Sequence, residues 1–464
     1  MVTSEAAPFA KTGGLADVLG ALPPALANLG EEVVVVMPKY GGVRIPKAER
    51  IWNAMPLSVG HHDFTVAVDQ IVREGVRYLF VDCPPLYGGL GVYSEAGADY
   101  PNNHIRFALL NQAALGIARQ IFTPDIFHGH DWPAGLLAPY LRENYASDPV
   151  LRGVKCVMTI HNLGYQGLFP GSQLGDLGLG PSLFHPEGLE FWGQVNFLKA
   201  GIVWSDAITT VSPTYAREIQ TPEYGFGLDG VLRRRAGQIT GILNGVDYME
   251  WDPEHDPHLR YHYSARNLSG KRLARRALLK EMGLPHNEKR PLIGIVSRFA
   301  HQKGFDLVEE IVPELMDEEL SMVILGSGDP HFERLFRSLA QNYPAKIAVN
   351  IGYDNALAHR IEAGADMFLM PSRYEPCGLN QMYSLRYGTV PIVRSTGGLA
   401  DTVDETTGFK FTEYSPEALL HAIRQALAAW HIRKPWLERM RLGMSKDFSW
   451  EASAAGYQRL YRSL

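Results

Sequence analysis

The chain has 464 residues, too many for one hydrophobic core, and its 46% hydrophobic content is ordinary for a globular protein of two or three domains. A formal net charge of -6 argues against a nucleic-acid or anionic-membrane surface, and the most apolar run, Val33 to Met37, is too short to span a bilayer. Three cysteines without CxxC spacing indicate neither a disulfide framework nor a cysteine zinc site. We therefore expect a soluble, cytoplasmic protein with no nucleic-acid or membrane partner.

The first half of the chain is predicted to be an α/β domain, because short apolar runs typical of buried strands alternate with helical periods. The predicted strands are Glu32 to Met37, Val76 to Val81, Asp125 to His128, Val154 to Ile160, Ala207 to Val211 and Ile239 to Leu243. The predicted helices are Ile105 to Gln120, Gly135 to Asn144 and Phe197 to Trp204. Only Met1 to Thr3 precede the first loop, so we expect the first strand to be a truncated stump.

A second α/β unit is predicted from Arg290 onward, where the alternation of strand and helix begins again. Its predicted strands are Pro291 to Val296, Met322 to Leu325, Ile347 to Ile351, Met367 to Met370 and Pro391 to Val393. The two units are expected to join near Asn244 to Asp256, and Trp450 to Leu464 is expected to form a helix that packs back on the first unit. The predicted domains are residues 1–246, residues 247–449, and a terminal helix at 450–464.

The hexapeptide Thr-Gly-Gly-Leu-Ala-Asp occurs twice, at Thr12 to Asp17 and at Thr396 to Asp401. In each copy a glycine pair allows a tight turn and Leu-Ala-Asp begins an amphipathic run, which predicts a strand, a glycine loop and a helix N-terminus. Only the first copy is preceded by a lysine, Lys11. The two halves are therefore expected to share an architecture but to contribute different residues to the chemical reaction.

Two cations follow the predicted strand Pro291 to Val296, where ligands of open α/β sheets bind. Arg298 can contact phosphate oxygens through its guanidinium fork and Lys303 can act as a point charge, so together they could neutralise a diphosphate. Two solvated surface charges are the alternative. The predicted loop Gly326 to Asp329 offers further backbone amides to phosphate.

Three other nucleotide-binding modes are disfavoured by what the sequence lacks. A Walker lysine and the GxGxxG fingerprint are both absent, which argues against a P-loop ATPase and a dehydrogenase. No Asp-x-Asp occurs, which argues against nucleotide-sugar binding through a chelated metal ion.

Glu375 and His161 are the candidate sugar-binding residues, because His161 directly follows one predicted strand and Glu375 lies in the loop that follows another. Glu375 precedes a helix predicted to start near Leu379 and could accept hydrogen bonds from sugar hydroxyls, or it could be a helix-capping acid. His161 could contact a sugar or be a satisfied core histidine. Cys377 is expected to be a packed small side chain, and the His128 to Asp131 run suits carbohydrate hydrogen bonding better than metal binding.

Taken together, these motifs resemble the bacterial glycogen synthases and plant starch synthases, over essentially the whole chain. The resemblance rests on Lys11 to Val18, His130 to Trp132, Ile160 to Asn162, Asn244 to Asp247, Ser297 to Gly304 and Glu375 to Leu379. It implies a GT-B fold, in which two Rossmann-like doubly wound domains face each other across a deep cleft. It also implies transfer of glucose from ADP-glucose to the nonreducing end of glycogen or another α-1,4-glucan, with retention of configuration and with neither cofactor nor metal.

The resemblance also implies roles for individual residues. Lys11, Arg298 and Lys303 would contact the donor phosphates, while His161 and Glu375 would act at the glucose, and these five are the expected catalytic residues. Asp131 and Trp132 would contact the acceptor. The remaining expected donor contacts are Gly13, Gly14, Asn244, Gly326, Tyr353 (stacked on adenine), Cys377, Gly378, Leu379 and Thr396.

Three alternatives remain open from the sequence. The same reaction could use UDP-glucose or another acceptor, because base choice depends on backbone contacts. A noncatalytic glucan-binding relative and a nucleotide-sugar epimerase of similar build are the others. The sequence carries no signal of oligomeric state.

Overall fold

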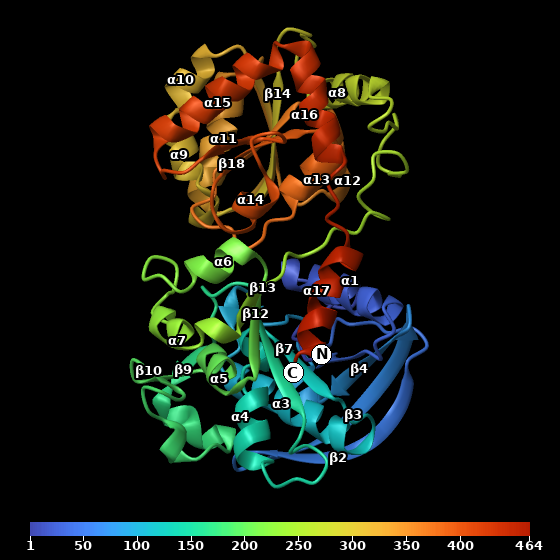
Figure 1. Ribbon diagram of the computed structural model, residues 1–464, viewed down its shortest axis with the longest axis vertical. Helices are drawn as coiled ribbons and strands as arrows, with labels where there is room; N and C mark the ends of the chain where they lie inside the picture. The colour runs from blue at the N-terminus through green and yellow to red at the C-terminus, as the bar shows by residue number, and fades with distance from the viewer. The chain divides into compact units, whose positions relative to one another are not determined.

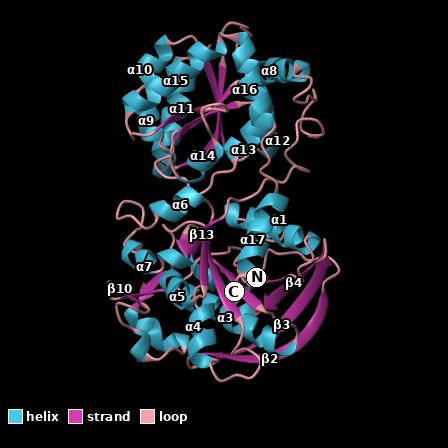
Figure 2. Cartoon of the chain, in the orientation of Figure 1, coloured by secondary structure: helices cyan, strands magenta, loops and turns pink.

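Two α/β units make up the chain in the computed structural model, which describes residues 1–464 (Figure 1). Unit 1 comprises Met1–Gly245 together with Trp450–Leu464, and unit 2 comprises Val246–Ser449. The first unit thus ends one residue before the predicted position, residue 246. In both units, strands form a central sheet with helices packed against it (Figure 2).

The sheet of unit 1 has two four-stranded parts. In one, β1 (Val34–Pro38) pairs in parallel with β4 (Val76–Asp82), and the antiparallel strands β3 (His62–Arg73) and β2 (Glu49–Val59) extend it. In the other, β7 (Ile126–His130), β8 (Lys155–Ile160), β12 (Ala207–Thr210) and β13 (Ile239–Gly241) are all parallel. Val2 forms a parallel bridge to Val36 on β1 and to Gly129 on β7, so the segment around Val2 joins the two parts.

Two sequence predictions for unit 1 need correction. The long hairpin of β2 and β3 was missed, because antiparallel strands with one solvated face alternate polar and apolar residues and lack a continuous apolar run. The helix predicted over Gly135 to Asn144 begins later than expected and is not α-helical throughout. It consists of α4 (Leu137–Pro139) followed directly by a π-helical segment, η2 (Tyr140–Asn144).

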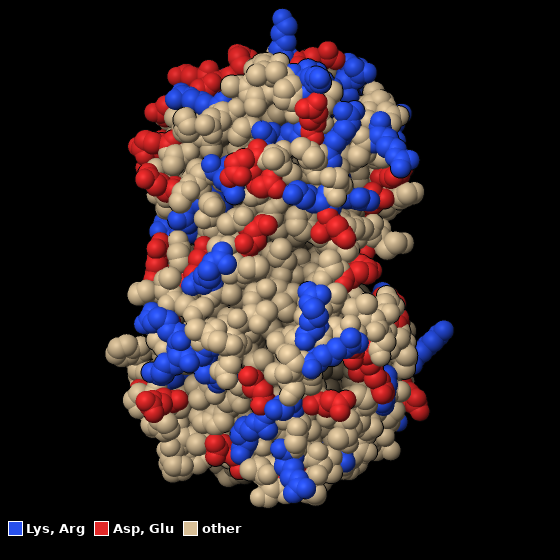
Figure 3. All heavy atoms as spheres, viewed as in Figure 1, with Lys and Arg blue, Asp and Glu red and all other residues tan.

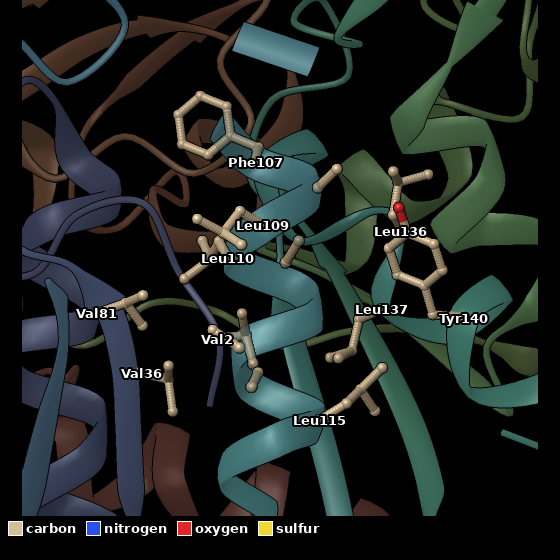
Figure 4. Close-up of a cluster of buried hydrophobic side chains, with 14 of the residues drawn as sticks. Val2, Val36, Val81, Phe107, Leu109, Leu110, Leu115, Leu136, Leu137 and Tyr140 are labelled. Atoms are coloured by element: carbon tan, nitrogen blue, oxygen red, sulfur yellow. The ribbon is translucent and has the colours of Figure 1, made fainter. Parts of the chain in front are cut away.

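The core of unit 1 is centred on α3 (Asn103–Gln120), most of which is buried. Figure 4 shows Phe107, Leu109, Leu110 and Leu115 of this helix among apolar side chains of the sheet and of the segment Leu136 to Tyr140. A second cluster lies between α1 (Gly14–Asn28), the sheet and the C-terminal helix α17 (Trp450–Arg462), which contributes Trp450 and Tyr457. Figure 1 shows α17 beside α1. The helix that carries the first glycine motif is therefore packed on both sides.

Shorter elements complete unit 1. They are α2 (Pro84–Tyr87), β5 (Ser94–Glu95), β6 (Ala98–Asp99), η1 (Trp132–Ala134), β9 (Leu168–Pro170), η3 (Gly171–Leu177), η4 (Pro181–Leu183), β10 (Glu190–Phe191), β11 (Gln194–Asn196), α5 (Phe197–Trp204), α6 (Pro213–Glu218), α7 (Asp229–Arg234) and η5 (Ala236–Gln238).

Unit 2 contains a six-stranded parallel sheet in the order β16-β15-β14-β17-β18-β19. Its strands are β14 (Leu292–Phe299), β15 (Ser321–Gly328), β16 (Ile347–Ile351), β17 (Met367–Met370), β18 (Val390–Arg394) and β19 (Phe409–Phe411). The five predicted strands are confirmed and β19 was missed.

The helical elements are α8 (Ser269–Glu281), η6 (His301–Lys303), α9 (Phe305–Glu310), α10 (Val312–Asp317), α11 (Pro330–Asn342), α12 (Asn355–Gly364), α13 (Asn380–Arg386), α14 (Gly397–Thr402), α15 (Pro416–Trp430) and α16 (Arg433–Met444).

Helices cover both faces of this sheet, as the continuous apolar strands require. One core cluster contains Phe305, Phe336 and Ile423 from α9, α11 and α15. A separate cluster contains Leu278 and Ile361 from α8 and α12. Unit 2 is therefore doubly wound, which places the carboxyl ends of its parallel strands at one edge.

The surface is mixed in charge. Lys, Arg, Asp and Glu are interspersed on the face shown of each unit in Figure 3, in keeping with the small net charge of -6. Every helix is too short or too polar to cross a lipid bilayer.

Candidate active site

The first glycine motif of unit 1 has an open backbone face. Gly13 caps α1 in an extended conformation with φ -159°, and a Cβ added to Gly13 or Gly14 would meet no atom within 4 Å. Glu5, which sequence reasoning missed, holds the preceding residue, because its buried carboxylate accepts hydrogen bonds from the Thr12 backbone N–H and, at 2.9 Å, from the Thr12 hydroxyl. The loop is thus fixed from behind while its glycines face free space.

Lys11 is bound to the helix that follows it. Its Nζ lies 2.6 Å from Oδ1 of Asp17, and the side chains are 49% and 37% exposed. Ion pairs this exposed contribute less than about 1 kcal/mol, because solvent screens them. A phosphate with more charge could therefore draw the Lys11 ammonium away from Asp17.

His161 directly follows β8 and hydrogen-bonds a second histidine, a contact that the sequence analysis did not predict. Its Nε2 lies 3.0 Å from Nδ1 of His130, the last residue of the neighbouring strand β7. Burial lowers the pKa of His161 to about 3 and that of His130 well below its usual range, so both imidazoles are neutral at pH 7. Only the adjacency of the two strand ends brings these residues together.

The hydrogen bond between the two imidazoles favours one pair of tautomers. Nε2 of His130 is buried without a partner, and an unpaired buried N–H costs more than an unpaired acceptor. His130 therefore carries its proton on Nδ1 and donates it to Nε2 of His161. The proton of His161 then sits on Nδ1, where it can be donated to a bound molecule.

Asp131 adopts a backbone conformation that is uncommon for a residue with a side chain, with φ +54°. Its Oδ1 accepts the backbone N–H of His161 at 2.7 Å, which links the ends of β7 and β8. Burial raises the pKa of Asp131 to about 7, although bonds from the His161 and Asn162 N–H groups act in the opposite direction. This carboxyl can therefore be neutral or ionised near physiological pH.

Trp132 and Asn244 occupy different surroundings in unit 1. The partly buried Trp132 ring packs edge-on against Phe107 with a centroid distance of 4.8 Å, and its face lies against the backbone of Gly167. Asn244 follows β13 and is 7% exposed, and its Oδ1 is buried without a hydrogen-bond partner. An unsatisfied amide oxygen at a strand end is the kind of group that a ligand hydroxyl completes.

In unit 2, Lys303 and Glu375 form an ion pair. Nζ of Lys303 lies 2.6 Å from Oε2 of Glu375, whose side chain is 8% exposed, and the Ser372 hydroxyl donates to the same oxygen at 3.0 Å. The loops meet because β14 and β17 are adjacent and the Arg373 N–H donates to the Gln302 carbonyl. Sequence reasoning gave these residues separate tasks and did not predict their contact.

Arg298 precedes Lys303 by a few residues along the chain and lies within β14. β14 continues to Phe299, so Arg298 pairs with Ser327 in the sheet and its side chain is exposed. The predicted loop at Gly326 is wrong for the same reason, because β15 continues to Gly328 and Gly326 pairs with Ser297 and Ile351. The N–H of Gly328 donates to the Glu333 carboxylate at 3.1 Å, so it already has an anionic partner.

The second glycine motif has no open face. Gly397 has φ +45°, and a Cβ there would lie 1.9 Å from the Glu375 carbonyl oxygen, while a Cβ on Gly398 would lie 2.0 Å from that of Cys377. Thr396, 1% exposed, caps α14, and the Gly398 N–H donates to the Glu375 carbonyl at 3.1 Å. This motif therefore positions the segment that carries Glu375.

The other predicted residues of unit 2 lie nearby or at the surface. Cys377 is buried, as expected, Gly378 has φ +71°, and Leu379 directly precedes α13, which begins at Asn380. Tyr353 follows β16 and is 84% exposed, so its ring is open to a stacking partner. The structure thus groups Lys303, Glu375, Cys377 to Leu379 and Thr396, while Arg298 lies near the end of β14 and Tyr353 follows β16.

Metal binding by the His128 to Asp131 run is disfavoured, because the side chains of His128 and His130 already form hydrogen bonds within the protein. Nδ1 of His128 contacts the Tyr461 hydroxyl at 2.6 Å and Nε2 contacts the Thr159 hydroxyl at 2.5 Å. His130 uses Nδ1 for His161. These imidazoles therefore form a hydrogen-bonded series rather than a set of converging ligands.

Comparison with known proteins decides the family. The family model described as the starch synthase catalytic domain matches residues 1–234, and the model of glycosyl transferases group 1 matches residues 280–442. The chain is 51% identical to a glycogen synthase of Anaeromyxobacter dehalogenans, covering 100% of this chain and 98% of the relative, and 50% identical to one of Koribacter versatilis, covering 99% and 96%. This chain belongs to the glycogen and starch synthase family.

Solved structures agree with this family assignment. The catalytic domain of starch synthase IV from Arabidopsis thaliana, bound to ADP and acarbose, superposes with a TM-score of 0.89 at 33% identity, covering 99% of this chain and 97% of that one. A sucrose-phosphate synthase from Thermosynechococcus elongatus, at 18% identity, has a TM-score of 0.62 and supports the fold alone. The predicted GT-B class, with two Rossmann-like units, is confirmed.

Proposed function

We propose that this member of the family transfers glucose from ADP-glucose to the nonreducing end of an α-1,4-glucan and releases ADP, with retention of anomeric configuration. The observation that carries the proposal is the Lys303–Glu375 ion pair, which joins the loops that follow the neighbouring strands β14 and β17. It is supported by the similarity to a starch synthase that binds ADP and acarbose.

In unit 2, the proposed task of Arg298 and Lys303 is to stabilise the diphosphate as the sugar–phosphate bond breaks. Fixed cations stabilise such a leaving group without a metal ion, because they need no reorganisation when the charge develops. Glu375 lies in contact with Lys303, so its free lone pairs can accept hydroxyls of the glucose attached to that diphosphate. Tyr353 supplies an exposed ring for the adenine.

In unit 1, Lys11 and the open glycine face are proposed to bind donor phosphate, and the neutral His161 to contact the glucose. An imidazolium would oppose the positive charge that forms at the anomeric carbon, whereas an imidazole held neutral by burial imposes no such repulsion. The Nδ1–H set by His130 is available to a sugar hydroxyl. The buried side-chain oxygen of Asn244 would accept a hydrogen bond from another sugar hydroxyl. Asp131 and Trp132 would contact the acceptor.

Retention fits attack from the same face of the sugar as departure, with the leaving phosphate accepting the proton of the acceptor hydroxyl. Such a mechanism needs cations to stabilise the phosphate and does not need the two carboxylates of a glycoside hydrolase. The carboxylates at these sites are engaged otherwise, since Glu375 binds Lys303 and Asp131 binds the His161 N–H.

The test is a side-by-side assay of labelled glucose incorporation into glycogen from ADP-glucose and UDP-glucose. ADP-glucose should be the preferred donor, and Arg298→Ala should reduce kcat/KM by at least about 100-fold through loss of a charge-assisted phosphate contact. Arg337→Ala, which removes an exposed arginine on α11, is the matched control and should not change it. A clear preference for UDP-glucose would replace the donor in this proposal, and no incorporation from either donor would refute it.

A further inference from the structure

Three histidine side chains and one aspartate carboxylate lie close together in unit 1. None of these four residues takes part in the proposed reaction. His61 lies in the turn between β2 and β3, His62 is the first residue of β3, and Asp176 lies in η3. The nearest ligand-type atoms of these three all lie within 4.8 Å of one another. His104, in the first turn of α3, contacts the same carboxylate from the buried side.

The distances in this cluster allow metal coordination, and the hydrogen bonds that join His62 and His104 to Asp176 are long ones. Nε2 of His62 lies 3.4 Å and Nε2 of His61 lies 3.6 Å from Oδ1 of Asp176, longer than the 2.7–3.2 Å usual for a hydrogen bond. Ligands bound tetrahedrally to zinc at about 2.0–2.1 Å are separated from one another by roughly 3.3–3.4 Å. Each imidazole nitrogen therefore lies near this spacing from the carboxylate oxygen, and the ligand atoms of all three residues lie within 4.8 Å of one another.

His104 supplies the support that metal-binding carboxylates usually have. Its Nε2 lies 3.3 Å from Oδ2 of Asp176, the oxygen that does not face His61 and His62, and its side chain is 6% exposed. Its Nδ1 is buried without a partner, which favours the tautomer with the proton on Nε2. A donor at this place orients the carboxylate so that Oδ1 points toward the imidazoles of His61 and His62.

The backbone brings the two segments together independently of these side chains. Gly60, with φ +57°, precedes the histidines, and a Cβ there would lie 2.5 Å from the Asp176 carbonyl oxygen. The Tyr140 hydroxyl donates to the Leu177 carbonyl at 2.6 Å and holds the end of η3. The turn and η3 are thus in direct backbone contact, and the ligand spacing does not depend on the rotamers alone.

We propose that His61, His62 and Asp176 bind a divalent transition-metal ion, with water completing the coordination and His104 orienting the carboxylate. Zn²⁺ suits the set best, because imidazole and carboxylate ligands at tetrahedral spacing are typical of zinc. The site links the β2–β3 turn to η3 and takes no part in glucosyl transfer. Metal binding is therefore expected to stabilise unit 1 and to leave the transfer reaction unchanged.

The test is titration of the full chain, freed of any affinity tag and of bound metal, with ZnCl₂ in a calorimeter. The wild type should bind one equivalent and unfold at a higher temperature when zinc is present. Co²⁺ should give the intense visible absorption of a tetrahedral complex. Asp176→Asn, which keeps the side-chain shape, and His62→Ala should each weaken zinc binding by about tenfold or more.

His255→Ala is the matched control. His255 is another exposed histidine next to an acid, 78% exposed and 2.9 Å from Asp252, and its loss should change neither affinity nor stoichiometry. Absence of saturable binding at micromolar zinc would overturn the proposal. Equal zinc affinity in the wild type and in Asp176→Asn would also overturn it, because the ion would then bind elsewhere.

Discussion

The two glycine motifs predict opposite results for the same substitution. At Gly13, alanine fits the extended backbone and its methyl group would enter free space. At Gly397, alanine must adopt φ +45° and its Cβ would lie 1.9 Å from the Glu375 carbonyl oxygen. We therefore expect Gly13→Ala to affect ligand binding and Gly397→Ala to affect folding.

The magnitudes follow from these geometries. In Gly397→Ala, the left-handed conformation costs about 1–2 kcal/mol and the displacement of packed backbone about 1–3 kcal/mol, so unit 2 should lose roughly 2–5 kcal/mol. For a unit of this size that is a fall in Tm of about 5–15 °C. Gly13→Ala should change stability by less than about 0.5 kcal/mol. The methyl group added in Gly13→Ala occupies the open face that is proposed to bind phosphate, so it should cost about 1.5–3 kcal/mol of binding, or roughly 10- to 100-fold in kcat/KM.

Calorimetric unfolding and steady-state kinetics on both variants measure the two effects separately. The expected pattern is a stable Gly13→Ala with impaired turnover and a destabilised Gly397→Ala. Full activity in Gly13→Ala would refute the assignment of the open glycine face to the donor. A wild-type Tm in Gly397→Ala would refute the structural role of the second motif.

Three further predictions concern individual side chains. Lys303→Met leaves the 8%-exposed Glu375 carboxylate without its cation and should cost about 3–5 kcal/mol in chemical denaturation, whereas adding Glu375→Gln should recover part of that loss. Because burial raises the pKa of Asp131 to about 7, the folded chain holds a proton that the unfolded chain releases near pH 4. The free energy of unfolding of the wild type should therefore fall as pH rises from about 4 to about 7. Asp131→Asn has no such titration, so its stability relative to the wild type, measured by urea unfolding, should increase across that range. A difference that does not change with pH would exclude the raised pKa of Asp131. Finally, His130→Leu should lower kcat about tenfold with little change in KM, and His130→Asn, which keeps a donor near Nδ1, should restore most of it.

The sequence predicted those parts of the fold that are encoded by local pattern. The parallel strands β8 and β17 are almost entirely buried and mainly apolar, so their positions were predicted to within a residue. The hairpin of β2 and β3 has mixed polarity on its exposed face and carries no such signal. Gly326 was predicted to lie in a loop because glycine is frequent in turns, but pairing with two neighbouring strands keeps it in the sheet.

The candidate site was predictable as a set of residues and not as a set of contacts. Lys303 and Glu375 are separated by 72 residues, and His130 and His161 by 31, so their contacts depend on which strands lie side by side. The same holds for Glu5, whose role depends on its buried contact with Thr12. A Ser-Glu-Ala-Ala loop alone gives no indication of that contact.

The most direct test of the central claim is to follow ADP release and primer growth together. With ADP-glucose and a maltooligosaccharide labelled at its reducing end, the account predicts one added glucose per ADP released. The lengthened product should be fully digestible by an α-1,4-specific amylase. Release of ADP without growth of the primer, or growth through a bond that the amylase does not cleave, would contradict the account.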